Sequence, residues 1–342
     1  MSQQIGGETL GNTQEYHQSQ YRDARNVLAR FAMYSLELCN EGENPFDQEL
    51  EIVTGFYGLE LPLDATILDM GTSDAHFIDY LNVSGFRGKL IGSDPNSDQY
   101  RKKVLGDSSV AATERRKQLA WLVFADLPNE SIESLILYDD YTDTNVHKLL
   151  IRADANNVPI RDKAVDAYVA NNMLYHLTDI DGALIEAKNT LTTNGIFVAS
   201  TSGKFNKHEH REDEVYINRR IAEITDSVSL PPLKMNDGFT TEKARFMLPK
   251  HFKHVYFLNH DGVLLVRDEF SKSIYRNSLY SMYDQFDPLP DRELFESLVD
   301  EVISNIGEEG KLIRVSRSVA FCSDTDLEGL DMQRYEKLEK AV

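Results

Sequence analysis

The middle of the chain alternates short apolar runs, which have the length of buried strands, with amphipathic stretches, which have the period of helices. The first run, TILDM at 66–70, leads into a helical stretch that begins HFIDYL. Strands and helices that alternate in this way form a mostly parallel sheet with helices on both faces and right-handed crossovers. We therefore predict an α/β fold with a doubly wound sheet. Its core strands are predicted at 66–70, 89–94, 149–155, 164–170 and 195–201.

One helix of this core is defined by its own pattern. Thr178 and Asp181 form a candidate capping box at its start, and Asn194-Gly195 is predicted to end it. A helix at this place supplies the crossover that the last two parallel strands require. Its apolar face consists of Ile180, Leu184, Ala187 and Leu191.

The N-terminal part of the chain lies outside this rhythm. Residues 1–15 are rich in Gly, Gln and Thr and are predicted to be disordered. Apolar positions in 21–39 have the spacing of an amphipathic helix. We predict that residues 1–60 form a tail and a helical cap.

Residues 61–342 are predicted to form one domain with two long insertions, at 101–147 and 204–238. Insertions of this length between core elements usually serve as lids or substrate walls. Three apolar runs in the last third of the chain would extend the sheet. They lie at 254–259, 262–268 and 312–321.

The composition is that of a globular protein with an acidic balance. Apolar residues make up 41% of the chain and charged residues 27%, which is ordinary. There are 56 Asp and Glu against 36 Lys and Arg, a formal net charge of −20. A field of that sign repels phosphate backbones, so we expect no nucleic-acid partner.

The cysteines, the N-terminus and the lengths of the apolar stretches indicate the cellular compartment. The two cysteines, Cys39 and Cys322, lie far apart without C-x-x-C spacing, so we expect neither a disulfide framework nor a cysteine-rich zinc site. The N-terminus lacks the features of a signal peptide, and no stretch approaches the roughly 18 apolar residues of a membrane span. We expect a cytoplasmic protein without a membrane partner. The oligomeric state stays open.

The stretch ATILDMGTSDAHF at 65–77 ends an apolar strand on an acid and turns through glycine and small polar residues. Such a turn lets backbone N–H groups approach a nucleotide-like cofactor, and an acid after the next strand binds its ribose. Asp94 stands there, 25 residues after Asp69. Taken alone, it could equally be a helix cap or a solvated loop residue. The dinucleotide fingerprint G-x-G-x-x-G is not met, because Ser73 and His76 occupy two of its glycine positions.

The turn itself reads D-x-G-x-S-x-A, which resembles the first motif of class I S-adenosylmethionine-dependent methyltransferases. IGSDPN resembles the ribose-binding acid of that family, and RADANNVPIRDKAVDAYVANNMLYHLTD at 152–179 resembles its adenine-binding acid and fourth strand. ALIEAKNTLTTNGIFVASTSG at 183–203 resembles the helix and strand that follow. YRDARNVLAR at 21–30 resembles the N-terminal helix of bacterial small-molecule members, which packs over the cofactor pocket. The resemblance covers residues 20–203.

The resemblance implies a Rossmann-like, doubly wound sheet of seven strands, S-adenosylmethionine as cofactor and S-adenosylhomocysteine as product. It implies that Gly71 and Ser73 hold the methionine part of the cofactor. Asp69 would orient the same loop or reach the methionine amine through water. Asp94 would bind the ribose diol.

The resemblance also places residues at the adenine and at the reacting sulfur. Asp154 and Ala155 would meet the adenine. Asn171 and Asn172, just past the fourth strand, would line the pocket beneath the sulfonium.

A hydroxyl or ammonium acceptor must lose a proton, and His176 follows the fourth strand on the side where ligands bind, so it is the candidate general base. The alternative is a structural histidine bonded to its loop. Tyr21, Tyr175 and Tyr275 are candidate substrate contacts, with packing as the alternative for the last two. KHEHRED at 207–213 holds histidines that do not share a helix face, so we predict a solvated lid segment and no metal site.

Together these features predict transfer of a methyl group from S-adenosylmethionine to an O, N or C nucleophile of a small molecule in secondary metabolism. One alternative is a non-catalytic protein of the same fold that binds S-adenosylmethionine or S-adenosylhomocysteine. Others are a protein or RNA methyltransferase and a nicotinamide-dependent oxidoreductase. The acidic charge argues against RNA, and the unmet fingerprint argues against nicotinamide. Because fold alone does not prove function, the prediction depends on the pocket motifs.

Overall fold

The protein is described from a computed structural model. The residues that the structure describes are 37–38, 61, 64–72, 77–78, 81, 86, 88–95, 136–140, 147–203, 206–225, 238–280, 283, 290–327 and 335–338. The chain divides into two compact units. The sheet unit consists of Glu49–Thr201, Gly238–Asn259 and Ser318–Val342. The helical unit consists of Met1–Gln48, Ser202–Asp237 and His260–Arg317.

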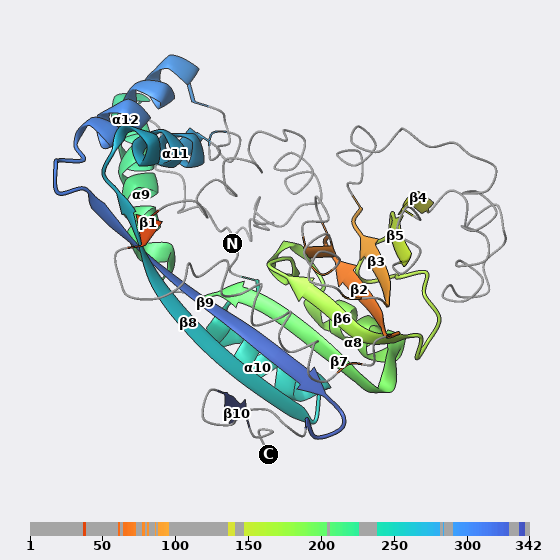
Figure 1. The fold of residues 1–342 in the computed structure, drawn as a ribbon. Coiled ribbons are helices and arrows are strands. Elements are labelled where there is room, and N and C mark those ends of the chain that lie inside the picture. Colours follow the sequence, from red (N-terminus) through yellow and green to blue (C-terminus); the bar gives the residue numbers. More distant parts are fainter. Residues whose placement is uncertain are drawn as a thin grey trace, which may run out of the picture. The chain divides into compact units, whose positions relative to one another are not determined.

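Parallel strands form the centre of the sheet unit (Figure 1). Strand β2 (Thr66–Met70) lies between β3 (Lys89–Ser93) and β6 (Val165–Asn171). Next to these, β3 pairs with β5 (His147–Ile151) and β6 pairs with β7 (Leu191–Ser202), again in parallel. The five predicted core strands are therefore confirmed, with shifted ends, and the mostly parallel α/β fold with them.

The sheet is wider than the seven strands implied by the resemblance. Its order is β1-β8-β9-β7-β6-β2-β3-β5-β4, and β10 also pairs with β8, so ten strands of the described residues join it. The strands β8 (His254–Val266) and β9 (Lys311–Ser323) confirm that the late apolar runs extend the sheet. Three strands were not predicted: β1 (Glu37–Leu38), β4 (Ile136–Asp140) and β10 (Glu336–Leu338).

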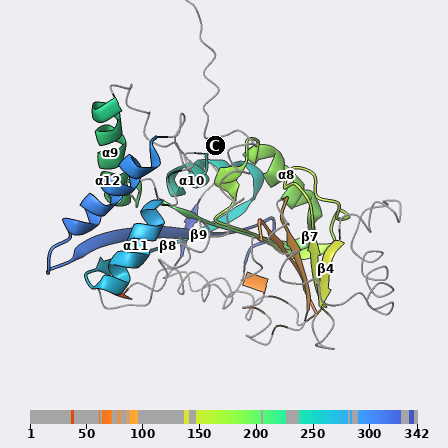
Figure 2. The same ribbon diagram turned by 90° about the horizontal axis from the view of Figure 1, so that it is seen from above.

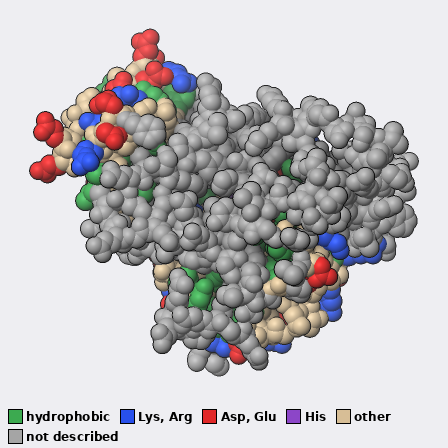
Figure 3. Space-filling model, viewed as in Figure 1, with side chains coloured by type: hydrophobic (Ala, Val, Ile, Leu, Met, Phe, Trp, Pro, Cys, Tyr) green, Lys and Arg blue, Asp and Glu red, His purple; other side chains and the backbone are tan. Residues whose placement is uncertain are grey.

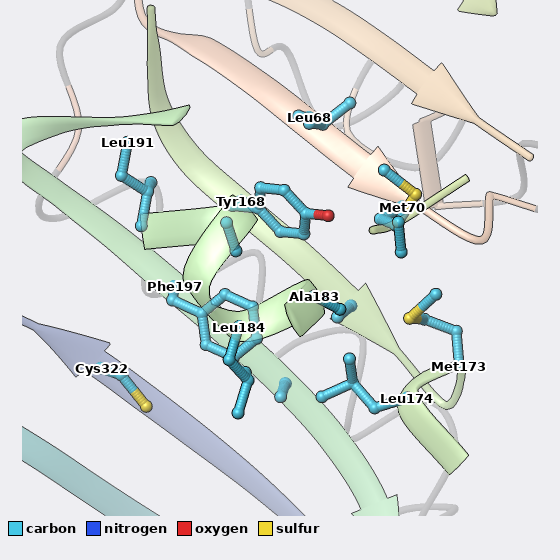
Figure 4. Close-up of a cluster of buried hydrophobic side chains, with 14 of the residues drawn as sticks. Leu68, Met70, Tyr168, Met173, Leu174, Ala183, Leu184, Leu191, Phe197 and Cys322 are labelled. Atoms are coloured by element: carbon cyan, nitrogen blue, oxygen red, sulfur yellow. The ribbon is translucent and has the colours of Figure 1, made fainter. Parts of the chain in front are cut away.

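The register of the parallel strands aligns one buried row of side chains across the sheet. Leu68 of β2 stands opposite Ile91 of β3 and Tyr168 of β6. The row continues from Ile91 to Leu149 and from Tyr168 to Phe197. All five are buried, and Figure 4 shows the Leu68, Tyr168 and Phe197 side chains in one cluster with Ala183 and Leu184. Burial of such apolar rows is the main source of folding free energy.

Both faces of the sheet are covered. Helices α8 (Ile180–Thr190) and α10 (Thr241–His251) lie on the same side (Figure 2) and share one hydrophobic cluster with the row above. On the other face, a second cluster includes the helical residues Phe77, Ile78 and Leu81. Burial on both faces explains why the core strands are near-continuous apolar runs rather than alternating ones.

The structure corrects the predicted boundaries of α8. The side chain of Asp179, not Thr178 or Asp181, caps the helix and accepts a hydrogen bond of 2.8 Å from the Gly182 N–H. The helix ends at Thr190, so Asn194-Gly195 does not stop it but lies inside β7. There the register with β6 shifts: Leu191 pairs with Val165 whereas Ile196 pairs with Ala167. The turn-like dipeptide thus belongs to an irregularity in the strand.

The helical unit packs around its own core. Helices α9 (Asn206–Thr225), α11 (Glu269–Tyr280) and α12 (Arg292–Ser304) enclose apolar side chains together with parts of β8 and β9. Charged side chains of both signs lie over these helices (Figure 3), including the Arg276–Asp300 pair at 2.9 Å. Within the described residues, no helix is long and apolar enough to cross a bilayer.

The N-terminal prediction is tested at one place. The helix expected at 21–39 is wrong at its end, because Glu37 and Leu38 form β1, which pairs antiparallel with Leu265 and Leu264 of β8. The rest of the predicted cap lies outside the described residues, as does most of the segment 101–147.

Candidate cofactor site

The candidate site lies at the edge of the sheet where the parallel strands β2, β3, β5 and β6 have their carboxyl ends. Ligands of open α/β sheets bind at this edge, since loops that leave it can diverge around a ligand. Those residues of the predicted cofactor set that the structure describes lie on these strands or in the loops that follow them. Parallel pairing therefore brings together positions that are far apart in the sequence.

The turn after β2 is fixed by its backbone. Gly71 has a left-handed conformation with φ of 72°. The N–H groups of Gly71 and Thr72 donate to the carbonyl of Ser93, at the end of β3, at 2.7 and 3.1 Å. A Cβ atom on Gly71 would lie 2.7 Å from Cβ of Met173, closer than packed atoms allow. Only glycine meets both requirements.

Two acids of the predicted set lie on neighbouring strands. Asp69 is buried, with 3% of its surface exposed, and stands within β2 opposite Gly92 and Val169. Asp94 directly follows β3 and is half-buried, and its N–H donates to the carbonyl of Ile151 on β5 at 3.2 Å. That bond fixes the backbone of Asp94 at the sheet edge, where an ionised carboxylate can accept hydrogen bonds from a diol.

The loop that follows β5 presents the predicted adenine residues. Asp154 is exposed and Ala155 is buried beneath it. Within the loop, Asp154 Oδ1 accepts from the Asn156 N–H at 2.8 Å and the Asp154 carbonyl accepts from the Asn157 N–H at 3.0 Å. These bonds close a tight turn of the type that Asp favours. The Asp154 side chain is exposed, so its carboxylate can also accept a hydrogen bond from an amino group.

The end of β6 offers a polar group without a partner. Oδ1 of Asn171 is buried and has no hydrogen-bond partner among the described residues. A buried acceptor in that state costs free energy, which a donor from a ligand would recover. Asn172 adopts a φ of 50°, and its N–H donates to the Ser200 carbonyl at 3.1 Å and to Ser200 Oγ at 3.2 Å. The turn after β6 is thereby fixed to β7.

The candidate base and its neighbour lie on the short 3-10 helix η3 (Leu174–His176). The rings of Tyr175 and His176 are half-buried, with centroids 4.3 Å apart, and the His176 N–H donates to the Met173 carbonyl at 2.9 Å. This position, just past β6, is the predicted one. Both the catalytic and the structural interpretation of His176 stay open.

The other candidate residues lie in the helical unit or outside the described residues. Tyr275 is fully buried in the core of the helical unit, where its hydroxyl donates to Asp213 at 2.6 Å. This is the place of a core residue, the alternative that the sequence left open. Ser73, Tyr21 and the side chains of 207–211 lie outside the description. Among the described residues, no three His, Cys, Asp or Glu are grouped to hold a metal ion.

Three supporting residues were missed by the sequence interpretation. Met173 contacts the Gly71 turn, Glu186 of α8 accepts from the Val158 N–H at 3.0 Å, and the Asn156 side chain donates to the Asp179 carbonyl at 2.6 Å. A half-buried glutamate inside an apolar helix face was the available signal for Glu186. The other two contacts depend on loop geometry.

The electrostatics under the loop follow from the same arrangement. Tyr168 is fully buried, and its hydroxyl has no hydrogen-bond partner among the described residues. Burial is the main cause that raises the pKa of Tyr168 far above its usual value, and the carboxylates of Glu186 and Asp154 add to it. The hydroxyl therefore stays protonated and neutral beneath the loop.

The part of the chain that contains the candidate site is similar to a known family. The family model described as a methyltransferase domain matches residues 68–199, from β2 into β7. The match agrees with the methyltransferase resemblance of the sequence motifs, and it supports S-adenosylmethionine as the cofactor. The curated proteins compared with the chain include no match.

Several solved structures are similar to the chain at low identity. The [4+2]-cyclase SpnF is 12% identical over 92% of this chain and 97% of its own, with a TM-score of 0.48. YcgJ from Bacillus subtilis is 13% identical over 82% and 100%, with a TM-score of 0.43. Geranyl diphosphate methyltransferase in complex with SAM is 11% identical over 80% and 84%, with a TM-score of 0.35. At identities this low, no residue role and no substrate of these proteins is assigned to this chain.

The residues present fit S-adenosylmethionine. Gly71 keeps the turn after β2 without a side chain and fixed to β3, as the small-residue loop of such a cofactor site requires. Oδ1 of Asn171 is a buried acceptor that could take a hydrogen bond from an ammonium group. The carboxylates of Asp94 and Asp154 can accept from ribose hydroxyls and from the amino group of adenine.

Proposed function

We propose that the protein binds S-adenosylmethionine at this edge of the sheet and transfers the methyl group to a small-molecule acceptor. The observation that carries the proposal is the Gly71 turn, which is fixed to β3 and leaves no space for a Cβ atom beside Met173. The family match over 68–199 supports methyl transfer. The net charge of −20 supports a neutral or cationic acceptor rather than an RNA.

The cofactor, when bound, supplies an activated methyl group on a sulfonium. The chain's contribution is therefore mainly to orient the reactants, which can be worth about 7–11 kcal/mol. In this proposal Asn171 Oδ1 and the Gly71 turn orient the methionine end, and the Asp94 carboxylate holds the ribose. His176 would accept a proton from a hydroxyl or ammonium acceptor, since its ordinary pKa of about 6.5 suits a base near neutrality.

Calorimetric titration with S-adenosylmethionine, S-adenosylhomocysteine and NAD tests the cofactor first. We expect both sulfur compounds to bind and NAD not to bind. In Asp94→Ala, affinity for S-adenosylhomocysteine should fall by about 10- to 100-fold, because hydrogen bonds to a charged group are lost. The matched control is Asp162→Ala, an exposed acid on the loop that precedes β6. Binding of NAD alone, or of none of the three, would overturn the proposal.

Release of S-adenosylhomocysteine from a panel of small acceptors then tests transfer. Release with a neutral or cationic acceptor supports the enzyme. Tight binding and slow exchange without release from any acceptor would favour the non-catalytic alternative.

A further inference from the structure

The loop after β5 is an irregular segment. Its conformation depends on hydrogen bonds within the loop and on hydrogen bonds to helix α8. Ala155 and Val158 are buried, while Asp154 and Asn156 are exposed. The internal turn closed by Asp154 accounts for the N–H groups of Asn156 and Asn157 only. The N–H of Val158 needs another acceptor, because a buried donor without one is costly.

Helix α8 supplies that acceptor and a second attachment. Oε1 of Glu186 accepts from the Val158 N–H at 3.0 Å, and the carbonyl of Asp179, the capping residue, accepts from Asn156 Nδ2 at 2.6 Å. The contact at the helix start is close: a Cβ atom on Gly182 would lie 2.9 Å from Asn156 Nδ2. The loop is thus held at two points, one at the N-terminus of α8 and one two turns further along.

Helix α8 is itself attached to neighbouring segments at both ends, so it can hold the loop in place. Nε2 of His251, on α10, lies 2.6 Å from Asp181 Oδ1 at the start of α8. Nζ of Lys188, near its end, donates to the His251 carbonyl at 2.6 Å and pairs with Asp324 at 2.9 Å. Glu186 stands between these two attachments.

We propose that Glu186 is a positioning residue for the cofactor's adenine end: its carboxylate, by binding the Val158 N–H, sets the loop conformation that presents Asp154 and Ala155 to the base. The inference rests on the proposed function. The inference adds to the proposed function a residue on α8 that is not among the predicted cofactor contacts. Glu186→Gln keeps an amide oxygen as acceptor, whereas Glu186→Ala removes the acceptor.

The test uses the full chain and measures affinity for S-adenosylhomocysteine and for S-inosylhomocysteine, which lacks the 6-amino group. We expect the wild-type chain to prefer the adenine compound. Glu186→Ala should weaken its binding by about tenfold and reduce the preference between the two compounds. Glu186→Gln should restore both to within about threefold of wild type, since it retains the acceptor. Ile185→Ala, an exposed position of the same helix, is the matched control.

A readout independent of any ligand is amide hydrogen exchange at Val158, which should accelerate in Glu186→Ala and not in Glu186→Gln. Should Glu186→Ala fail to fold, Asn156→Ala removes the other attachment from an exposed side chain and should act in the same direction. Wild-type binding together with unchanged affinity and preference in Glu186→Ala would overturn this inference alone. Failure of the wild-type chain to bind S-adenosylhomocysteine would overturn the proposed function and this inference with it.

Discussion

Gly71 shows how one backbone conformation shapes the candidate site. Its positive φ is open to glycine at no cost, whereas a residue with a Cβ atom loses about 1–2 kcal/mol there. The space is also closed by Met173. The sequence motif located this glycine, but the second constraint comes from a residue that is distant in the sequence.

Gly71→Ala should therefore lower the free energy of unfolding by about 1–3 kcal/mol and weaken binding of S-adenosylhomocysteine at least about tenfold. Denaturant unfolding and calorimetry measure the two effects. Gly238→Ala is the matched control, because a Cβ atom there finds its nearest neighbour at 3.4 Å, an ordinary contact. Equal behaviour of the two variants would contradict the role assigned to the turn.

Tyr168 is the opposite case, because the core encloses its hydroxyl without offering it a hydrogen-bond partner among the described residues. Tyr168→Phe removes a buried hydroxyl that has no partner among the described residues, so the free energy of unfolding should stay level or rise by about 1 kcal/mol. Tyr256→Phe, which deletes a hydroxyl that donates to Asp326, should lower it by about 0.5–1.5 kcal/mol. Urea unfolding of both variants checks the difference. An equal loss in both would mean that the Tyr168 hydroxyl has an unseen partner.

Among the elements, α8 has the most connections to the candidate site. Its apolar face was predicted from four residues: Ile180, Leu184 and Ala187 are confirmed in the core, whereas Leu191 lies past the helix end, at the start of β7. Its cap was misassigned because Thr178, Asp179 and Asp181 are all able to cap a helix, and the choice depends on where the preceding turn ends. Its polar residues could not be assigned from the pattern, since a helix pattern does not reveal which loop lies against it.

Strand β10 is attached by a surface ion pair whose strength depends on pH. The two terminal guanidinium nitrogens of Arg245, Nη1 and Nη2, donate to the Glu336 carboxylate, at 2.7 and 2.8 Å. These bonds are the main cause that lowers the pKa of Glu336 below its ordinary 4.5. A carboxyl whose pKa is lowered in the folded state contributes stability above its unfolded pKa, and that stability is lost as the pH falls through the folded value.

Arg245→Gln should thus cost about 0.5–1 kcal/mol of unfolding free energy at pH 7, as expected for an exposed pair, and distinctly less at pH 3. Urea unfolding at the two pH values measures the difference. In a Glu336→Gln background the same substitution should cost little at either pH. A cost that does not change with pH would show that Arg245 acts through packing on Phe257 instead, whose ring centroid lies 5.1 Å from the guanidinium.

At the scale of the whole molecule, the candidate cofactor residues that the structure describes all belong to the sheet unit. Saturating S-adenosylhomocysteine should stabilise that unit by mass action, by about 2.7 kcal/mol at a ligand concentration of 100 times Kd. Hydrogen exchange should slow at the carboxyl ends of β2, β3 and β6 and in the loop after β5. NAD at the same concentration should change neither the stability of the sheet unit nor its hydrogen exchange. Protection that is absent from these ends would place the ligand elsewhere.

How much could be predicted differs between core and periphery. The central strands and α8 were found because their period is a local property of the sequence. β4 was missed because its apolar run, LILY at 135–138, falls in the segment that we interpreted as an insertion, and because it pairs antiparallel at the edge of the sheet. β1 was missed because Glu37 and Leu38 lie within the amphipathic pattern of 21–39, and two residues have no period of their own.

The same division applies to the site. The sequence by itself determined the order of the cofactor motifs and the residue types at Gly71, Asp94 and Asp154, because these follow strand ends that the apolar pattern marks. Only the tertiary structure decided that Met173 closes the space at Gly71 and that Glu186 holds the loop of Asp154. The physical reason is range: propensity and period act between neighbours in the chain, whereas these contacts exist only once parallel pairing and helix packing have joined distant segments.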